Sequence, residues 1–250
     1  MSAPVPETHV GILGHSSEGA ALCFTEFCRQ AMRELGGHKH PDVTLDCISF
    51  DKCLQWYDTN DYASIKAQLS RSAARLQAAG ADFFCCPDNT AHPALEHGGA
   101  DLPLPGLHIG AVVAEEAARI GVTRIAVLGT AYTMDGPVYP RELAQRGLSC
   151  AVPDPDDRVL VNRIIFDELV HGVLTEASRK EYLRIIDGLA RRGCDGVALV
   201  CTEIPLLVTP AVSPLPTLDS TRLLARAAFE VCAGIRPVPT WRGGPVGDDR

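Results

Sequence analysis

Short apolar runs alternate along the chain with longer segments in which apolar residues recur every three to four positions. The short runs predict β-strands at residues 10–13, 43–50, 82–86, 124–128, 148–152 and 196–200. The longer segments predict helices at residues 18–35, 62–79, 112–120, 141–145, 158–171, 178–191 and 220–231. Strands that alternate with helices are typical of βαβ units, so the pattern predicts an α/β fold built on parallel sheets.

Two proline-rich segments interrupt this alternation, at residues 102–106 (LPLPG) and 210–216 (PAVSPLP). Because clustered prolines break regular structure, we expect the chain to cross into a second domain at the first segment and to return at the second. The predicted first domain comprises residues 1–104 and 215–235, and the second comprises residues 105–214. Residues 236–250 are rich in proline and glycine, which predicts a loose C-terminal tail.

The composition narrows the class of protein. A chain of 250 residues with 46% hydrophobic residues can bury a substantial core. The formal net charge of −8 argues against a general nucleic-acid binder, which needs a basic surface. The first residues lack the pattern of a secretory signal, and no apolar run reaches the roughly 20 residues that span a bilayer. We therefore expect a cytoplasmic protein that acts on a small molecule, with no membrane partner.

The ten cysteines and eight histidines do not form a recognisable metal motif. The cysteines are scattered through apolar runs and include no C-x-x-C pair. Free cysteines behave as small buried hydrophobic residues, so we expect most of them in the core. The histidines show no spacing typical of zinc, so no metal site is predicted.

An internal repeat points to a site. Residues 80–90 (GADFFCCPDNT) align with residues 193–203 (GCDGVALVCTE) at a constant interval of 113, which places Asp88 and Cys201 at equivalent positions. Residues 11–18 similarly align with residues 126–133. Parallel sheets bind ligands at the carboxyl ends of their strands, where these polar residues fall. The alternative is a pair of similar strand-turn segments with no catalytic consequence.

The same segments resemble the aspartate/glutamate racemase superfamily, which also includes hydantoin racemases, maleate isomerases and arylmalonate decarboxylases. The resembling motifs are residues 11–14 (GILG), 87–92 (PDNTAH), 129–130 (GT), 201–207 (CTEIPLL) and 216–221 (PTLDST). The resemblance covers almost the whole chain. It implies two similar parallel-sheet α/β domains related by a pseudo-two-fold axis, an active site in the cleft between them, catalysis without a cofactor, and a homodimer.

In the resembled family, two cysteines exchange protons with the α-carbon of the substrate from opposite sides, and neighbouring groups hold the α-carboxylate. The resemblance thus implies that Cys201 is one acid/base group. It also implies a set of residues around the substrate carboxylate: Ser16, Asn89, Thr90, Thr130 and Thr202. Fixed hydrogen-bond donors around a carboxylate stabilise the charge that develops when the α-proton leaves.

The sequence departs from the family pattern at the first cysteine, where Asp88 stands. A model-peptide Asp has a pKa near 3.9 and a Cys near 8.5, so at pH 7 the pair is by default a carboxylate base and a thiol acid. We therefore expect a racemase or epimerase that moves the α-proton of a small amino acid or a similar acid. The alternatives are a lyase or isomerase that uses Cys201 alone, and a carboxylate-binding protein without catalysis.

Three further residues have open roles. Lys52 is either a surface residue or the cation that a second substrate carboxylate would need, His92 either packs or transfers protons, and Glu203 either caps a helix or binds substrate. Cys85 and Cys86 lie in an apolar strand and are expected in the core. The chain has no Gly-x-Gly-x-x-Gly in its first turn and no lysine in a recognisable pyridoxal-phosphate setting, which favours chemistry without a cofactor.

Overall fold

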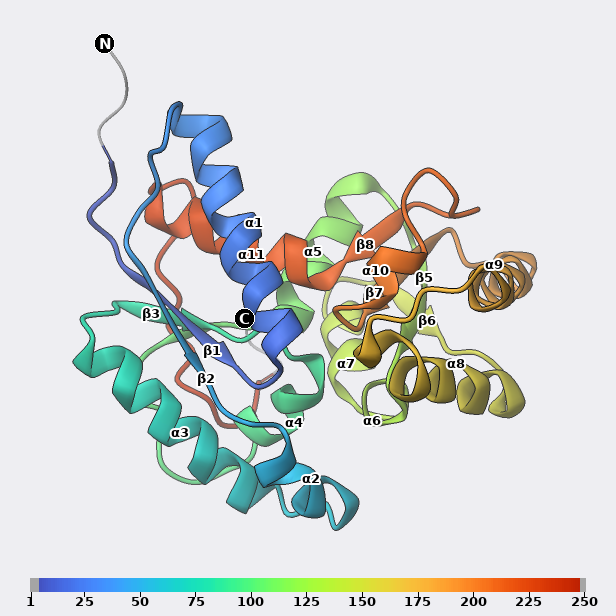
Figure 1. The fold of residues 1–250 in the computed structure, drawn as a ribbon, viewed down its shortest axis with the longest axis horizontal. Coiled ribbons are helices and arrows are strands. Elements are labelled where there is room, and N and C mark those ends of the chain that lie inside the picture. Colours follow the sequence, from blue (N-terminus) through green and yellow to red (C-terminus); the bar gives the residue numbers. More distant parts are fainter. Residues whose placement is uncertain (1–4, 248–250) are drawn as a thin grey trace. The chain divides into compact units, whose positions relative to one another are not determined.

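The computed structural model describes residues 5–247 (Figure 1). Contacts between Cα atoms divide the chain into two compact units, each described here by itself. Unit 1 comprises Met1–Ile109 and Thr221–Arg250, and unit 2 comprises Gly110–Ser220. Each unit contains one four-stranded sheet, and every strand pair in both sheets is parallel. The predicted α/β fold is confirmed.

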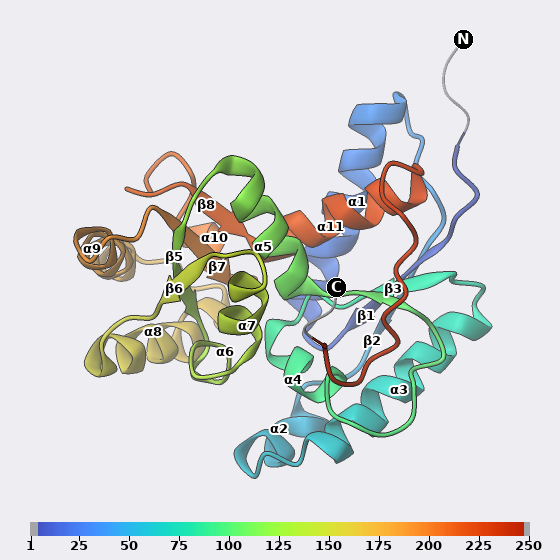
Figure 2. The same ribbon diagram turned by 180° about the vertical axis from the view of Figure 1, so that it is seen from behind.

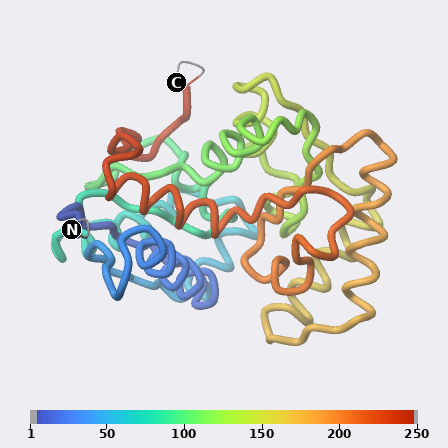
Figure 3. The backbone as a smooth tube through the Cα atoms, turned by 90° about the horizontal axis from the view of Figure 1, so that it is seen from above, coloured from blue at the N-terminus to red at the C-terminus, as the bar shows by residue number. Residues whose placement is uncertain are grey.

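The sheet of unit 1 has the strand order β2-β1-β3-β4. Its strands are β1 (Val10–Gly14), β2 (Val43–Cys47), β3 (Phe83–Cys85) and β4 (Gly106–Leu107). The helical segments are α1 (Ser17–Leu35), α2 (Asp51–Asp58), α3 (Tyr62–Ala78), η1 (Asn89–Ala91), α4 (His92–Leu95) and α11 (Ser220–Cys232). All residues of β1 are buried, because α1 and α3 cover opposite faces of the sheet (Figures 1 and 2). Continuous apolar sequence is typical of a strand covered on both faces. Figure 3 shows α1 (blue) beside α11 (red).

The sheet of unit 2 has the equivalent order, β6-β5-β7-β8. Its strands are β5 (Arg124–Gly129), β6 (Ser149–Ala151), β7 (Gly196–Val200) and β8 (Thr217–Asp219). The helical segments are α5 (Ile109–Ile120), α6 (Ala131–Met134), α7 (Val138–Ala144), α8 (Pro155–Asp167), η2 (Leu169–His171), α9 (Glu176–Arg191) and α10 (Ile204–Leu207). Strands β1 and β3 of unit 1 thus correspond to β5 and β7 of unit 2. The sequence repeat therefore reflects a repeated fold.

The two boundaries between the units lie a few residues beyond the positions that the prolines predict. Strand β4 pairs with β3 in the first sheet, and β8 pairs with β7 in the second. The chain therefore completes a short strand after each proline-rich segment before it leaves the unit. These strands begin in or directly after the proline-rich segments, where the sequence pattern predicts no regular structure, and the prediction therefore misses them. The helices α2, α4, α6 and α10 are also missed, because four to eight residues give too few turns to establish a helical period.

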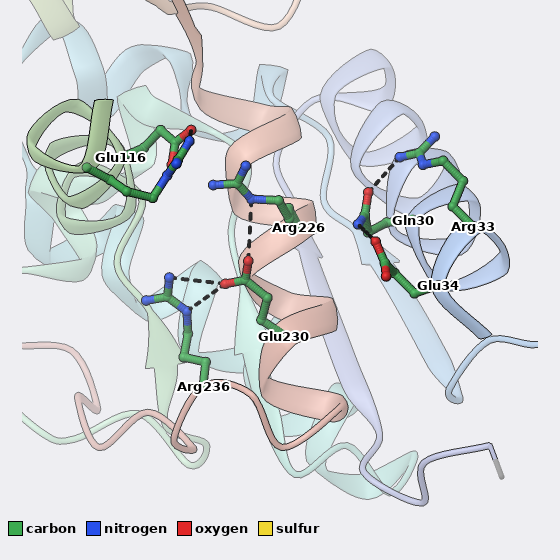
Figure 4. A network of polar contacts seen from close by, with 8 residues as sticks. Gln30, Arg33, Glu34, Glu116, Arg226, Glu230 and Arg236 are labelled. Carbon is green, nitrogen blue, oxygen red and sulfur yellow. Dashed lines mark hydrogen bonds and ion pairs between the residues drawn. The ribbon is translucent and has the colours of Figure 1, made fainter. Parts of the chain in front are cut away.

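Residues 236–247 are not the loose tail that their composition predicts, and we call them the C-terminal strap. Trp241 is 8% exposed, and its backbone carbonyl accepts a hydrogen bond from the Gly106 amide at 2.7 Å. At the start of the strap, Arg236 pairs with Glu230 of α11, which also pairs with Arg226 (Figure 4). Residues 248–250 of the predicted tail lie outside the described residues. Burial of one large aromatic side chain and backbone pairing hold the strap despite its composition.

Between residues 5 and 247, no helix combines the length and the apolar character needed to cross a bilayer.

Candidate active site

In unit 1, the turn after β3 presents the Asp88 carboxylate. Asp88 has extended backbone angles and directly precedes η1, so it lies at the transition from strand to helix. The backbone N–H of His15 donates a hydrogen bond to Asp88 Oδ2 at 3.0 Å. Asn89 is buried, while Asp88 and Thr90 are partly exposed. Since β1 and β3 are adjacent, the turns that follow them meet at one edge of the sheet, as the sequence predicts.

The turn after β1 packs tightly against its surroundings. A Cβ atom added to Gly14 would lie 2.6 Å from the Cβ of Ala20, so glycine is needed at the close approach to α1. Ser16 then occupies the N-cap position of α1, but its side chain makes no capping hydrogen bond. Its buried Oγ has no hydrogen-bond partner among the described residues. A hydroxyl next to the positive end of a 19-residue helix is well placed to meet an anionic group.

His15 is a site neighbour that the sequence analysis did not select. Its ring is fully buried and lies 5.1 Å from the ring of Phe50 and 5.7 Å from that of Tyr57, measured between centroids. Neither ring nitrogen has a hydrogen-bond partner within residues 5–247. Burial lowers the pKa of His15 to about 4, so the ring is neutral at pH 7. His15 therefore offers its backbone N–H, and not a charged ring, to Asp88.

The Asp88 charge acts on two further groups of unit 1. Burial raises the pKa of Tyr57 well above its usual value, and the neighbouring Asp88 charge adds to this effect. Burial also raises the pKa of the Cys47 thiol, again with a contribution from Asp88. Tyr57 and Cys47 are therefore protonated at pH 7. Both side chains can therefore serve only as neutral neighbours of Asp88 at this pH.

In unit 2, the turn after β7 presents the Cys201 thiol. Cys201 is partly exposed, and its Sγ donates to Glu203 Oε2 at 2.9 Å. Glu203 is buried and stands at the N-cap of α10, yet it makes no capping hydrogen bond. The two roles that the sequence left open for Glu203, interaction with the positive end of this helix and substrate binding, both stay predictions. The carboxylate contacts the thiol.

Neighbouring elements fix the rest of this edge of the second sheet. Thr130 is buried after β5, and its Oγ1 lies 3.3 Å from Thr133 Oγ1. The next amide, of Ala131, donates to Asn162 Oδ1 of α8 at 2.8 Å. Thr202 is also buried. Thr130 and Thr202 therefore lie in the turns that follow two adjacent strands, β5 and β7.

A buried tyrosine in unit 2 resembles Tyr57 in its surroundings. Burial raises the pKa of Tyr182 well above its usual value, and the charges of Cys201 and Glu203 contribute after burial. Tyr182 belongs to α9 and to the apolar core of unit 2. Each candidate turn thus stands near a fully buried, protonated tyrosine.

The His92 side chain is packed in the interior of unit 1. Its ring is fully buried, and its Nε2 lies 3.2 Å from the carbonyl oxygen of Cys86, a geometry in which Nε2–H donates. Trp241 and His108 pack against the ring. These contacts favour the packing role that the sequence left open.

Lys52 and the two cysteines of β3 fall in different surroundings. Lys52 lines a cavity of about 1020 Å³ beside the end of β2, together with Cys47, Trp56 and Arg71. Cys85 and Cys86 are buried and their pKa values are raised well above normal, for Cys85 by its contact with Cys23 and by burial, and for Cys86 by burial. The expected core location of both cysteines is confirmed.

Within the described part of the chain, no group of three or more His, Cys, Asp or Glu side chains is arranged to hold a metal ion.

Comparison with known proteins places the chain in a family. The model of the Asp/Glu/hydantoin racemase family matches residues 12–228. The chain belongs to this family. It is 27% identical over 169 residues to the broad specificity amino-acid racemase RacX of Bacillus subtilis (strain 168), a match that covers 67% of this chain and 72% of RacX.

Solved structures of family members share the fold. A crystal structure of a putative Asp/Glu racemase from Yersinia pestis is 31% identical, with a TM-score of 0.80, and the match covers 90% of this chain and 99% of that one. An aspartate racemase homologue from Pyrococcus horikoshii OT3 is 26% identical, with a TM-score of 0.77, and covers 91% and 99% respectively. An arylmalonate decarboxylase variant, at 15% identity and a TM-score of 0.55, shares the fold alone.

Proposed function

We propose that this member of the racemase family is a cofactor-independent racemase or epimerase of a small amino acid or a similar acid, with Asp88 and Cys201 as its two proton-transfer groups. The supporting observation is that the two side chains follow equivalent strands, β3 and β7, in two sheets of the same strand order. The similarity to a broad specificity amino-acid racemase supports the substrate class.

The reaction requires one base and one acid. The Asp88 carboxylate takes the α-proton, and the electron pair of the broken C–H bond moves toward the substrate carboxylate. The Cys201 thiol then gives its proton to the α-carbon and becomes a thiolate. The reverse direction starts from the opposite state, with Asp88 protonated and Cys201 ionised. General acid–base groups of this kind contribute about 10²- to 10⁴-fold each to the rate.

Glu203 assists Cys201 in this scheme. Its carboxylate accepts the thiol hydrogen at 2.9 Å and therefore holds the Cys201 sulfur at one position, and the S–H turns from Glu203 to the α-carbon when the thiol gives up its proton. Because Glu203 is buried, the contact has little competition from water. The sulfur is positioned before substrate arrives, and preorganisation of this kind lowers the barrier.

The substrate carboxylate is held by donors from the turns. In unit 1 these are Ser16, Asn89 and Thr90, and the start of α1 adds the positive end of a helix dipole. In unit 2 they are Thr130 and Thr202. Donors fixed around the carboxylate stabilise the negative charge that develops there in the transition state.

A substrate with a second carboxylate would need a cation, and we propose Lys52 for this role. Two carboxylates 4 Å apart repel each other by about 4 kcal/mol at an effective dielectric constant near 20, so Asp88 alone would oppose such a substrate. Lys52 lines the cavity together with Cys47, whose thiol is affected by the Asp88 charge. Lys52 thus lines a cavity beside a thiol on which the Asp88 charge acts.

Proton NMR in D₂O tests the proposal on a panel of L- and D-amino acids and small dicarboxylates. The wild type should replace the α-proton of at least one substrate by deuterium and form its other enantiomer. Asp88→Ala and Cys201→Ala should each abolish formation of the other enantiomer. Cys150→Ala is the matched control, because Cys150 lies on the edge strand β6, and it should retain full activity. An inactive wild type across the panel would contradict the proposal.

The contact between Cys201 and Glu203 also favours a second candidate, a lyase or isomerase that uses Cys201 alone. The thiol and its carboxylate partner belong to one turn and do not need Asp88 to be oriented. This candidate predicts a new product, formed by wild type and Asp88→Ala but not by Cys201→Ala. A carboxylate-binding protein without catalysis would instead bind equally well after Cys201→Ala.

The cellular location and the assembly complete the proposal. We propose that the protein works in the cytoplasm, where its ten cysteines would stay reduced, and that it forms a homodimer, as is usual in the family. Light scattering of the purified protein gives the mass directly. A mass of one chain, 26.8 kDa, would contradict the dimer.

A further inference from the structure

The C-terminal strap of unit 1 holds the segment that carries Asp88. That segment runs from Cys86 through Asp88 and η1 into α4, without a break. The Gly244 amide of the strap donates to the carbonyl of Leu95, the last residue of α4, at 2.9 Å. The strap therefore contacts the segment a few residues after Asp88.

A buried aromatic cluster makes the second contact. The Trp241 ring lies nearly parallel to that of His92, with centroids 6.2 Å apart. It also packs edge-on against His108 at 5.0 Å and lies tilted against Phe84 at 6.2 Å. His92 in turn binds the Cys86 carbonyl at 3.2 Å. Trp241 therefore supports a ring that joins the residues before Asp88 to those after it.

The strap is itself fixed in place. The Trp241 Nε1–H donates to the Gly244 carbonyl at 3.1 Å, and the Arg242 side chain donates to the Pro103 carbonyl at 2.7 Å. Gly243 has a φ of 74°, and an added Cβ would lie 2.9 Å from the Leu95 carbonyl oxygen. Only glycine meets both conditions, so the strap fits α4 at one position.

We propose that Trp241 is a positioning residue for Asp88. The inference rests on the proposed function, in which the Asp88 carboxylate takes the α-proton. The His15 N–H donates a hydrogen bond to Asp88 Oδ2, and that bond requires the turn after β3 to stay in register with β1. Loss of the Trp241 ring removes one of the two rings that pack against His92 and loosens its hold on the turn, which then moves relative to His15.

Amide hydrogen exchange, followed by NMR on the full-length protein, tests this inference without the need for a substrate. In Trp241→Ala, the His15 amide and the amides of residues 89–95 should exchange about tenfold faster or more, because local opening becomes easier. The amides of β5 and β7 in unit 2 should keep their rates. Trp241→Phe retains a ring on His92 and should restore most of the protection. Val238→Ala is the matched control, because Val238 is an exposed strap residue.

Turnover gives the second readout. Trp241→Ala should lower kcat by about tenfold to a hundredfold, the effect of a small misplacement of a reacting group, while KM stays within about threefold. Gly243→Ala should have the same effect through the clash with Leu95. Unchanged exchange at His15 in both variants would overturn the inference, and so would faster exchange that is uniform over unit 1. If Asp88→Ala is fully active, the proposed function fails, but the exchange result still decides whether the strap holds this turn.

Discussion

The turns after β3 and β7 occupy the same place in two similar units, but they hold different chemistry. In unit 1 a carboxylate, Asp88, is held by a backbone N–H from the neighbouring turn. In unit 2 a thiol, Cys201, is held by a carboxylate from its own turn. The comparison teaches that the repeated fold sets where a side chain stands, while the contacts of each turn set what it does. The predictions below test this difference, beginning with the largest effect.

A thiol in place of Asp88 would make the two turns alike. Asp88→Cys should lower kcat/KM by about a hundredfold at pH 6.5, because a thiol with an ordinary pKa near 8.5 is almost entirely protonated there. The activity should recover as the pH approaches 9. Asp88→Asn has nearly the same shape and no titratable group, so it should stay inactive at every pH. An Asp88→Cys enzyme with the same pH profile as the wild type would contradict the assignment of Asp88 as the base.

His15 should give the turn of unit 1 a characteristic dependence of stability on pH. Its pKa is lowered by burial from 6.5 to about 4 in the folded protein, so below pH 6.5 the unfolded chain binds the extra proton more readily. The free energy of unfolding should therefore fall as the pH drops from 6.5 to 4, by about 3 kcal/mol in total. Urea unfolding at several pH values measures it. His15→Leu should lack this component, while His38→Leu, at an exposed site, should keep it.

Equivalent glycines end β1 and β5, and they allow a direct comparison of packing. At Gly14, an added Cβ would lie 2.6 Å from the Cβ of Ala20. At Gly129, it would lie 2.7 Å from the Val200 side chain and 2.8 Å from the Val200 carbonyl oxygen. Each substitution by alanine should destabilise the protein by about 1–3 kcal/mol, with the larger loss at Gly129, where backbone must move. Urea unfolding gives both values. Gly98→Ala, where nothing lies within 4 Å, should be close to neutral, and an equal loss there would refute the argument.

Glu203 should show the smallest effect, limited to the turn of unit 2. Glu203→Gln keeps the shape but loses the charged acceptor, so kcat should fall about tenfold, which corresponds to the loss of one charge-assisted hydrogen bond. Glu176→Gln, at an exposed position on α9, is the control and should have no effect. If Glu203→Gln is also without effect, the contact with Cys201 does not contribute to turnover.

The sequence predicted the positions of the site better than its contacts. Six of the eight strands in the described residues and the interval between Asp88 and Cys201 followed from hydrophobic runs and an internal repeat, which are local signals. The hydrogen bond from His15 to Asp88 links residues 73 positions apart, and its direction depends on the turn geometry. No pattern along the chain encodes that geometry.

The strap shows the same limit more strongly. Arg242 reaches a carbonyl 139 residues away, and the contact lies in a segment whose proline and glycine content predicts disorder. Composition describes how an isolated segment behaves. The packing of Trp241 against the buried His92 ring orders the strap despite its composition. The contact between Cys201 and Glu203, only two residues apart, was also missed, because Glu203 at a helix start was expected to interact with the positive end of the helix or to bind substrate.

The most direct test of the central claim follows each enantiomer separately in D₂O. With one base on each side of the α-carbon, Cys201→Ala should still exchange the α-proton of one enantiomer through Asp88, and Asp88→Ala should exchange only the other enantiomer, through Cys201. Neither variant should interconvert them. If both variants exchange the same enantiomer, or if either still forms the opposite enantiomer at the wild-type rate, Asp88 and Cys201 are not the two proton-transfer groups.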